Sequence, residues 1–150
     1  MGTDVVLEVA RHIQGEAAWS TGQILVAWVI WCRVCSPHSH GYVADDAVLH
    51  VLGGFNGYNA HPGEMAMKLG RAIAAWDSVK LLMLAADEGV RLDAPYYFAM
   101  GQIDVNDWGW EDGEIVSYNP NVPGEAVHLY QRWPRKRAVE RSGRVPEGER

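Results

Sequence analysis

One glutamate stands where a helix is expected to end, and a carboxyl group in that position is suited to proton transfer. Glu16 follows Gly15, a natural helix terminator, in the segment His12-Ile13-Gln14-Gly15-Glu16-Ala17. The negative end of the helix dipole and desolvation by apolar neighbours such as Trp19 both favour a protonated carboxyl, which is the form of a general acid. Taken by itself, the pattern favours the ordinary case, an exposed glutamate that faces solvent.

A second group of side chains has the chemistry of metal ligands. Cys32, Cys35, His38 and His40 follow a C-x-x-C-x-x-H-x-H spacing, and sulfur with imidazole is a ligand set that suits zinc. Established zinc patterns separate their two ligand pairs more widely. The cysteines also lie one turn apart near the end of an apolar run, where free cysteine behaves as a small hydrophobic residue. We therefore expect no metal site and no cofactor.

The third feature is a high aromatic content, part of it on loops. The chain has seven Trp and six Tyr, and Tyr58, Trp108 and Trp110 fall in glycine-rich segments. A flat ring suits the apolar face of a sugar, and neighbouring Asn and Gln amides suit its hydroxyl and N-acetyl groups. Aromatic residues also dominate ordinary cores, so composition leaves sugar binding and packing equally open.

Several enzyme classes and partners are disfavoured by what the sequence lacks. It contains no glycine-rich phosphate loop, nucleophile elbow or zincin motif. The net charge of -6 divides into about -10 on residues 1–131 and +4 on residues 132–150, and an acidic body argues against nucleic acid as the main partner. No apolar run approaches the roughly 18 residues of a membrane span. The chain begins without a basic and apolar leader, so no secretory signal is visible.

The elements that must position these side chains are mainly helices. A first helix begins at a polar cap, Thr3 or Asp4, and ends at the Gly-Glu pair described above. Ser20 and Gln23 form a capping box ahead of the apolar run 24–34. We expect this second helix to be the core helix.

Two further helical regions and one hairpin complete the predicted domain. Asp45 or Asp46 caps a short helix that Gly53-Gly54 closes, and the apolar periodicity of residues 64–88 predicts one long helix, or two with a break at Asp77-Ser78. Short strands over 115–118 and 126–130 are expected to pair as a hairpin. The predicted fold class is therefore α+β and mainly helical, with one domain over residues 1–131 and a disordered basic tail over residues 132–150.

Six short motifs follow one another at plausible spacings between residues 9 and 131. They are Gly15-Glu16-Ala17 at the end of the first helix, Gly22-Gln23 opening the second, Cys32-Arg33-Val34 closing it, then Phe55, Tyr96-Tyr97-Phe98 with Trp108, and His128-Leu129-Tyr130. Each motif alone is common. The ordered set resembles the SleB-type cell-wall hydrolases, the spore-cortex-lytic group within the lysozyme-like superfamily.

The resemblance implies a lysozyme-like fold in which Glu16 is the catalytic residue. It also implies a peptidoglycan substrate, cut between N-acetylmuramic acid and N-acetylglucosamine. The residues expected to line the substrate groove are Gln23, Phe55, Tyr58, Asn59, Tyr97, Phe98 and Trp108. Three departures bear on substrate preference: Cys32 replaces an Asn, the stretch between Glu16 and Gln23 is shorter, and Asp93-Ala94-Pro95 replaces Asp-Pro-Thr-Gly.

The expected mechanism uses a single carboxyl group. Glycosidases with two carboxylates place them roughly 5 Å apart for retention or 6.5 to 9.5 Å apart for inversion, and only Asp104 and Asp107 are candidates by location for a second one. The resemblance implies a lytic transglycosylase instead. Glu16 would protonate the glycosidic oxygen and then accept the proton of the muramic 6-hydroxyl as an anhydro ring closes, without water.

Three alternatives stay open on the sequence. The first is a muramidase that uses the same glutamate. The second is a non-catalytic glycan-binding or virion structural module, since a fold does not guarantee a function. The third is a small zinc-binding interaction domain. The missing leader suits an enzyme encoded by a phage or prophage and released to the periplasm or cell exterior.

Overall fold

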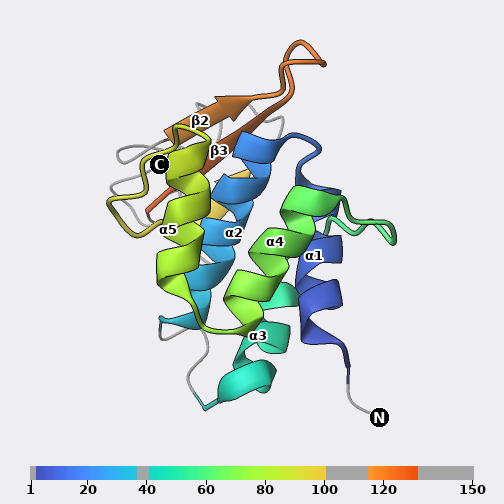
Figure 1. Cartoon of the computed structure of the whole chain (residues 1–150), viewed down its shortest axis with the longest axis vertical. Coiled ribbons are helices and arrows are strands. Elements are labelled where there is room, and N and C mark those ends of the chain that lie inside the picture. The colour runs from blue at the N-terminus through green and yellow to red at the C-terminus, as the bar shows by residue number, and fades with distance from the viewer. Residues whose placement is uncertain (1–2, 37–40, 101–114, 132–150) are drawn as a thin grey trace, which may run out of the picture.

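The computed structural model describes residues 3–36, 41–100 and 115–131. Within these ranges the chain forms five helices followed by a three-stranded antiparallel sheet (Figure 1). The elements are α1 (Val5–Glu16), α2 (Ser20–Val34), α3 (Ala44–Leu52), α4 (Glu64–Ala74), α5 (Ser78–Asp87), β1 (Phe98–Met100), β2 (Ile115–Tyr118) and β3 (Ala126–Tyr130). The α+β, mainly helical class predicted from the sequence is confirmed. Residues 132–150, predicted to be a disordered tail, lie outside the described ranges.

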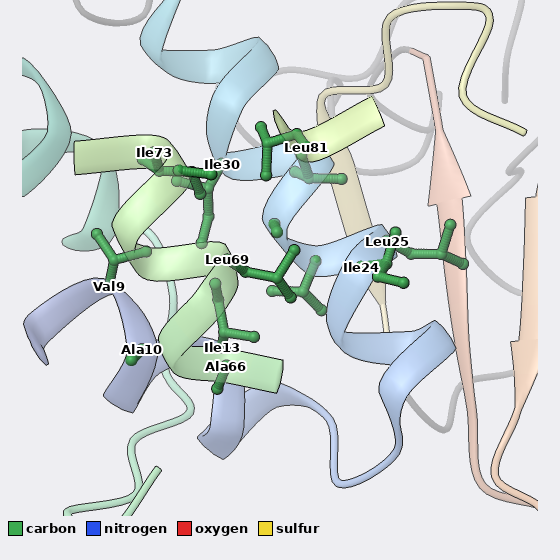
Figure 2. Close-up of a cluster of buried hydrophobic side chains, with 14 of the residues drawn as sticks. Val9, Ala10, Ile13, Ile24, Leu25, Ile30, Ala66, Leu69, Ile73 and Leu81 are labelled. Carbon is green, nitrogen blue, oxygen red and sulfur yellow. The ribbon is translucent and has the colours of Figure 1, made fainter. Parts of the chain in front are cut away.

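Helix α2 is the core helix, as predicted. It packs against α1, α3, α4, α5 and all three strands. Its side chains are buried around most of the helix, which is why its sequence is apolar on every face rather than on one stripe. Figure 2 shows Ile24, Leu25 and Ile30 of α2 within the cluster that α1, α4 and α5 complete. None of the described helices is both long and apolar enough to cross a membrane.

Helices α1 and α4 pack closely because a glycine lies at their contact. A Cβ atom on Gly70 would lie 2.6 Å from the carbonyl oxygen of Val6 and 3.3 Å from the backbone nitrogen of Ala10. Leu69 and Ile73, on the same helix, enter the core cluster with Ile13 of α1 (Figure 2). The close approach fixes α1, and with it the position of Glu16 at the end of this helix.

The predicted helix starts were partly correct. Asp4 caps α1, since its side chain accepts the Leu7 amide at 3.1 Å. The predicted capping box at Ser20 is wrong, because Trp19 is the N-cap of α2 and no side chain caps this helix. The side chain that was expected to complete the box, Gln23, forms its hydrogen bonds elsewhere, with Gln14 and Ala17.

The later helices begin and end close to the predicted points. Val43 rather than an aspartate is the N-cap of α3, and Asp45 and Asp46 lie in its first turn, where their charge still favours the helix dipole. The region 64–88 forms two helices, with the break at the predicted place and Asp77 as the cap of α5. Its side chain accepts the Lys80 amide at 2.9 Å.

The sheet contains the predicted hairpin and one strand that was not predicted. β3 lies in the centre and pairs antiparallel with β2 on one side and with β1 on the other. The register places Val116 opposite His128 and Phe98 opposite Tyr130. β1 has only three residues, too few for an alternating pattern to be recognised in the sequence. The β2–β3 hairpin therefore pairs with β1 through β3.

Replacement of Gly70 by alanine tests the contact between α1 and α4. Alanine has the higher helix propensity, by about 1 kcal/mol, so an uncrowded site would be stabilised. The clash with the Val6 carbonyl reverses this, and we expect Gly70→Ala to lower the free energy of unfolding by about 1–3 kcal/mol in urea titrations. Gly53→Ala is the control, because Gly53 has an ordinary helical backbone conformation at the end of α3. A Gly70→Ala protein more stable than the wild type would contradict the contact.

Candidate active site

The loop between α3 and α4 lies directly against the end of α1. A Cβ atom on Gly15 would overlap the backbone nitrogen of Tyr58, and one on Gly57 would lie 2.6 Å from the carbonyl carbon of Gly15. The two backbones therefore touch, and no side chain fits at either position. The next residue of the loop after Tyr58 is Asn59. Its backbone amide donates to the carbonyl of Arg11 at 2.9 Å and holds the loop against α1.

This contact brings a backbone donor to the candidate catalytic residue. The Gly57 amide donates to Oε1 of Glu16 at 2.7 Å. Glu16 is half-buried and is the last residue of α1, so its predicted place at a helix end is confirmed. A hydrogen bond from a backbone amide to a carboxylate is charge-assisted and holds the side chain in one orientation.

A cation near the end of α2 interacts electrostatically with Glu16. Arg33, near the end of α2, donates through Nε to the carbonyl oxygen of Tyr97 and has its guanidinium carbon 4.8 Å from the centre of the Phe55 ring. Burial lowers the pKa of Arg33, and the negative charge of Glu16 raises it again. Gly54 leaves room for this side chain, because a Cβ there would lie 2.9 Å from Nη1 of Arg33. Arg33 thus joins the loop, α2 and the start of the sheet beside Glu16.

Two glutamines hold the segments on either side of Glu16. Gln23 is only 4% exposed, and its side-chain nitrogen donates to Oε1 of Gln14 and to the carbonyl oxygen of Ala17, each at 3.0 Å. The same oxygen of Gln14 accepts the amide of Gly63 at 2.9 Å, at the far end of the loop. Gln23 was expected to contact substrate. The structure places it behind the site, where it fixes the turn after Glu16.

The chain beyond Glu16 is also tied to the sheet. The indole nitrogen of Trp19 donates to the hydroxyl of Ser117 in β2 at 2.7 Å, and the Thr21 hydroxyl lies at the same distance from it. The Trp19 ring covers Gly22, where a Cβ would lie 2.5 Å from the ring. The short connection between α1 and α2 is therefore held by side-chain contacts rather than by a helix cap.

Three of the residues predicted to contact substrate share the loop beside Glu16. Phe55 lies half-buried under the Arg33 guanidinium, as described above. Tyr58 is exposed, and its ring meets the edge of His12 with a centroid distance of 5.3 Å. Asn59 is exposed, and its side-chain oxygen accepts the amide of His61 at 2.9 Å. All three belong to the loop whose Gly57 amide binds Glu16. Their contact with substrate stays a prediction.

The other predicted contacts are less fully described. Tyr97 is half-buried, and its backbone accepts from Arg33 and donates to the carbonyl of Tyr130 at 3.0 Å. Phe98 begins β1, and its side chain lies outside what the structure describes. Trp108 lies outside the described residues altogether, as do Asp104 and Asp107, the two candidates for a second carboxylate.

A cavity of about 410 Å³ adjoins the site on the side of Arg33. It is lined by Arg33, His50 and Val51 together with Gly53 and Gly54. His50 stacks on Tyr42, with the ring centres 4.0 Å apart. A ligand in this cavity would therefore lie against the Arg33 side chain.

The proposed metal ligands are only half described. Cys32 is buried and Cys35 is exposed, and both are free thiols. Burial raises the pKa of the Cys32 thiol to about 11, which favours the neutral form over the thiolate that binds metals. His38 and His40 lie outside the described residues, and the described part of the chain contains no group of three side chains able to hold a metal ion.

Three residues important to this geometry were not selected from the sequence. Arg33 is a single charge within the apolar run of α2, and a lone cation in such a run was a signal for a buried ion contact. Gly57 and Gln14 gave no comparable signal, because their roles depend on the loop packing against α1.

Comparisons of the chain with models of protein families, with curated proteins and with solved structures gave no match.

The hydrogen bond between Gly57 and Glu16 is open to a direct test by amide hydrogen exchange. Removal of the acceptor in Glu16→Ala should accelerate exchange of the Gly57 amide by roughly 10- to 100-fold, the loss expected for one hydrogen bond to a charged group. The Asn59 amide is the internal control, because its acceptor is the Arg11 backbone and is unchanged. Equal exchange rates for Gly57 in the two proteins would show that this bond is not formed.

The two thiols should differ in reactivity. We expect an aromatic disulfide reagent at pH 8 to modify Cys35 rapidly, and Cys32 only after unfolding, since a thiol with a pKa of about 11 is on the order of one part in a thousand thiolate at that pH. Metal analysis of the same protein completes the test. Similar modification rates at both cysteines would contradict the assignment of Cys32 as a buried, neutral thiol. One equivalent of bound zinc that protects both cysteines would contradict it too and would support the zinc site.

Proposed function

We propose that this chain cleaves the glycan strands of peptidoglycan between N-acetylmuramic acid and N-acetylglucosamine, as a lytic transglycosylase with a lysozyme-like fold. The observation that carries the proposal is the environment of Glu16. This carboxyl group ends α1, accepts the Gly57 amide at 2.7 Å and acts electrostatically on Arg33. The ordered motifs that resemble SleB-type hydrolases place the catalytic glutamate at the same residue.

The reaction requires one group that first gives a proton and then takes one. In the first step Glu16 protonates the glycosidic oxygen, the bond from that oxygen to C1 of the muramic residue breaks, and the glucosamine 4-hydroxyl leaves. In the second step the muramic 6-hydroxyl attacks C1, and the Glu16 carboxylate takes its proton. The bond that closes is the 1,6-anhydro bridge. Glu16 ends the cycle protonated, and no water is consumed.

The neighbours of Glu16 suit this sequence of events. When the proton leaves, a carboxylate forms, and both the Gly57 amide and the Arg33 guanidinium stabilise that negative charge. Neither group has to move, because the amide is fixed by the contact with Gly15 and the guanidinium by the Tyr97 carbonyl. The bond to Oε1 leaves Oε2 to face the sugar. Preorganised donors of this kind are the usual source of a large part of enzymatic rate enhancement.

The loop beside Glu16 offers the surface that a sugar needs. Tyr58 is 52% exposed and lies one residue after the amide that binds Glu16. A phenol ring in this position supplies an apolar platform for a pyranose, and the neighbouring Asn59 supplies a polar side chain for its substituents. Asp104 and Asp107 lie outside the described residues, so the proposal rests on one carboxyl group.

The proposal is tested by comparing Glu16→Gln with Glu64→Gln on purified cell-wall sacculi. Loss of the only acid and base should lower the rate of turbidity clearance by roughly 10²- to 10⁴-fold in Glu16→Gln. Glu64→Gln is the matched control, since Glu64 forms only a surface ion pair with Lys68, at 3.2 Å, and such pairs contribute little. A Glu16→Gln protein that clears sacculi at the wild-type rate would exclude this residue. A wild-type protein that binds sacculi without releasing fragments would identify a non-catalytic module.

A further inference from the structure

Helix α5 has an apolar stripe on the side that faces away from the core. Its members recur at helical spacing and are exposed: Val79 (64%), Leu82 (40%), Met83 (55%) and Ala86. Among the described elements α5 packs only against α2 and α4, through the opposite face that carries Leu81, Leu84 and Ala85. Figure 1 shows α5 on the outside of the helical layer.

This stripe breaks the usual rule for a surface helix. The face of such a helix that points to solvent normally carries charged and polar residues, and large contiguous apolar patches on monomers usually mark interaction sites. Here α5 is apolar on two faces. Four of the nine large apolar side chains that are exposed in the described chain belong to α5 or to the residues that lead into it.

Trp76 is the exposed large side chain that leads into α5, and its backbone is held in an unfavourable conformation. It follows α4 with a φ of +56°, where the amide of Asp77 donates to the carbonyl of Ala72 at 2.9 Å. Glycine is the usual residue at this position after a helix, because an L side chain there is sterically strained. The Trp76 ring meets the Trp31 ring edge to face at 5.6 Å and is still 42% exposed. A large aromatic ring is thus retained at the start of α5.

The charges beside the stripe are complementary to those of a second copy. Lys80 and Asp87 are both exposed, lie on the same flank of α5 and line the groove between α5 and α4. Suppose two α5 helices meet antiparallel about a two-fold axis between Leu82 and Met83. Lys80 then lies opposite position 85 of the other copy. Asp87 of that copy is two residues beyond position 85, which is an offset of about 3 Å along the helix axis. A lysine side chain spans this offset, and the symmetry forms the ion pair twice.

We propose that this chain forms an antiparallel two-fold dimer through the exposed face of α5. Leu82 of one copy packs on Met83 of the other, Val79 packs on Ala86, and the pairs of Lys80 with Asp87 set the direction. A helix of ten residues is about 15 Å long, so the interface is at the small end of the range and the dimer is reversible. The inference is independent of the proposed enzymatic activity.

Sedimentation equilibrium over roughly 10 µM to 1 mM protein tests the dimer, a range suited to a small interface. We expect the wild type to associate and Met83→Lys to raise the dissociation constant by at least about tenfold. Val43→Lys is the control, because Val43 is also an exposed valine, 75% accessible, but precedes α3. A wild type that stays monomeric throughout, or a dimer that Met83→Lys leaves unchanged, would overturn the proposal.

A charge exchange tests the direction of pairing. Lys80→Asp alone places two aspartates opposite each other, and Asp87→Lys alone places two lysines opposite each other, so each variant should dissociate more readily than the wild type. An equimolar mixture of the two variants restores opposite charges at both contacts and should associate again. Circular dichroism confirms that each variant is folded. A mixture that associates no better than the separate variants would overturn the antiparallel arrangement.

Discussion

The contact between the backbones of Gly15 and Gly57 is the constraint on which the candidate site depends. Because no side chain separates the two residues, the loop after α3 reaches the last turn of α1, and the Gly57 amide reaches Glu16. The same approach places Tyr58 beside α1 and lets the Asn59 amide bind the Arg11 carbonyl. A larger residue at either glycine would move the loop, and with it the donor and the aromatic ring that the proposed chemistry needs.

Polar contacts between distant segments hold that arrangement together. Gln14 accepts from Gln23 and from Gly63, so one side-chain oxygen ties the turn after Glu16 to the far end of the loop. Arg33 reaches from α2 to the start of the sheet, where it donates to the Tyr97 carbonyl, and it interacts electrostatically with Glu16. The buried member of this network is Gln23, whose side-chain amide is costly to leave unpaired and is paired with Gln14 and Ala17. The packing of α1 on α4 through Gly70 supplies the rigid base for these contacts.

Apolar patterning predicted the core helix, the helical region 64–88 and the β2–β3 hairpin, because these features follow from local spacing. The sequence left open whether residues 64–88 form one helix or two, and the structure has two. The position of Glu16 at a helix end and the grouping of Phe55, Tyr58 and Asn59 on one loop were also visible in the sequence. The capping box at Ser20 failed because Gln23 satisfies its hydrogen bonds in the core. Gly57 and Gln14 acquire their roles only through contacts between distant segments, which no local pattern encodes. Arg33 is a lone cation in an apolar run, which indicates a partner but not which one.

In the proposed reaction Glu16 is both acid and base, and the cleavage consumes no water. Mass spectrometry of fragments released from purified sacculi in heavy-oxygen water tests this claim most directly. We expect muramic ends that are lighter than reducing ends by one water, as 1,6-anhydro sugars are, and that carry no heavy oxygen. Reducing muramic ends that contain heavy oxygen would contradict it, and would show that the same glutamate directs hydrolysis.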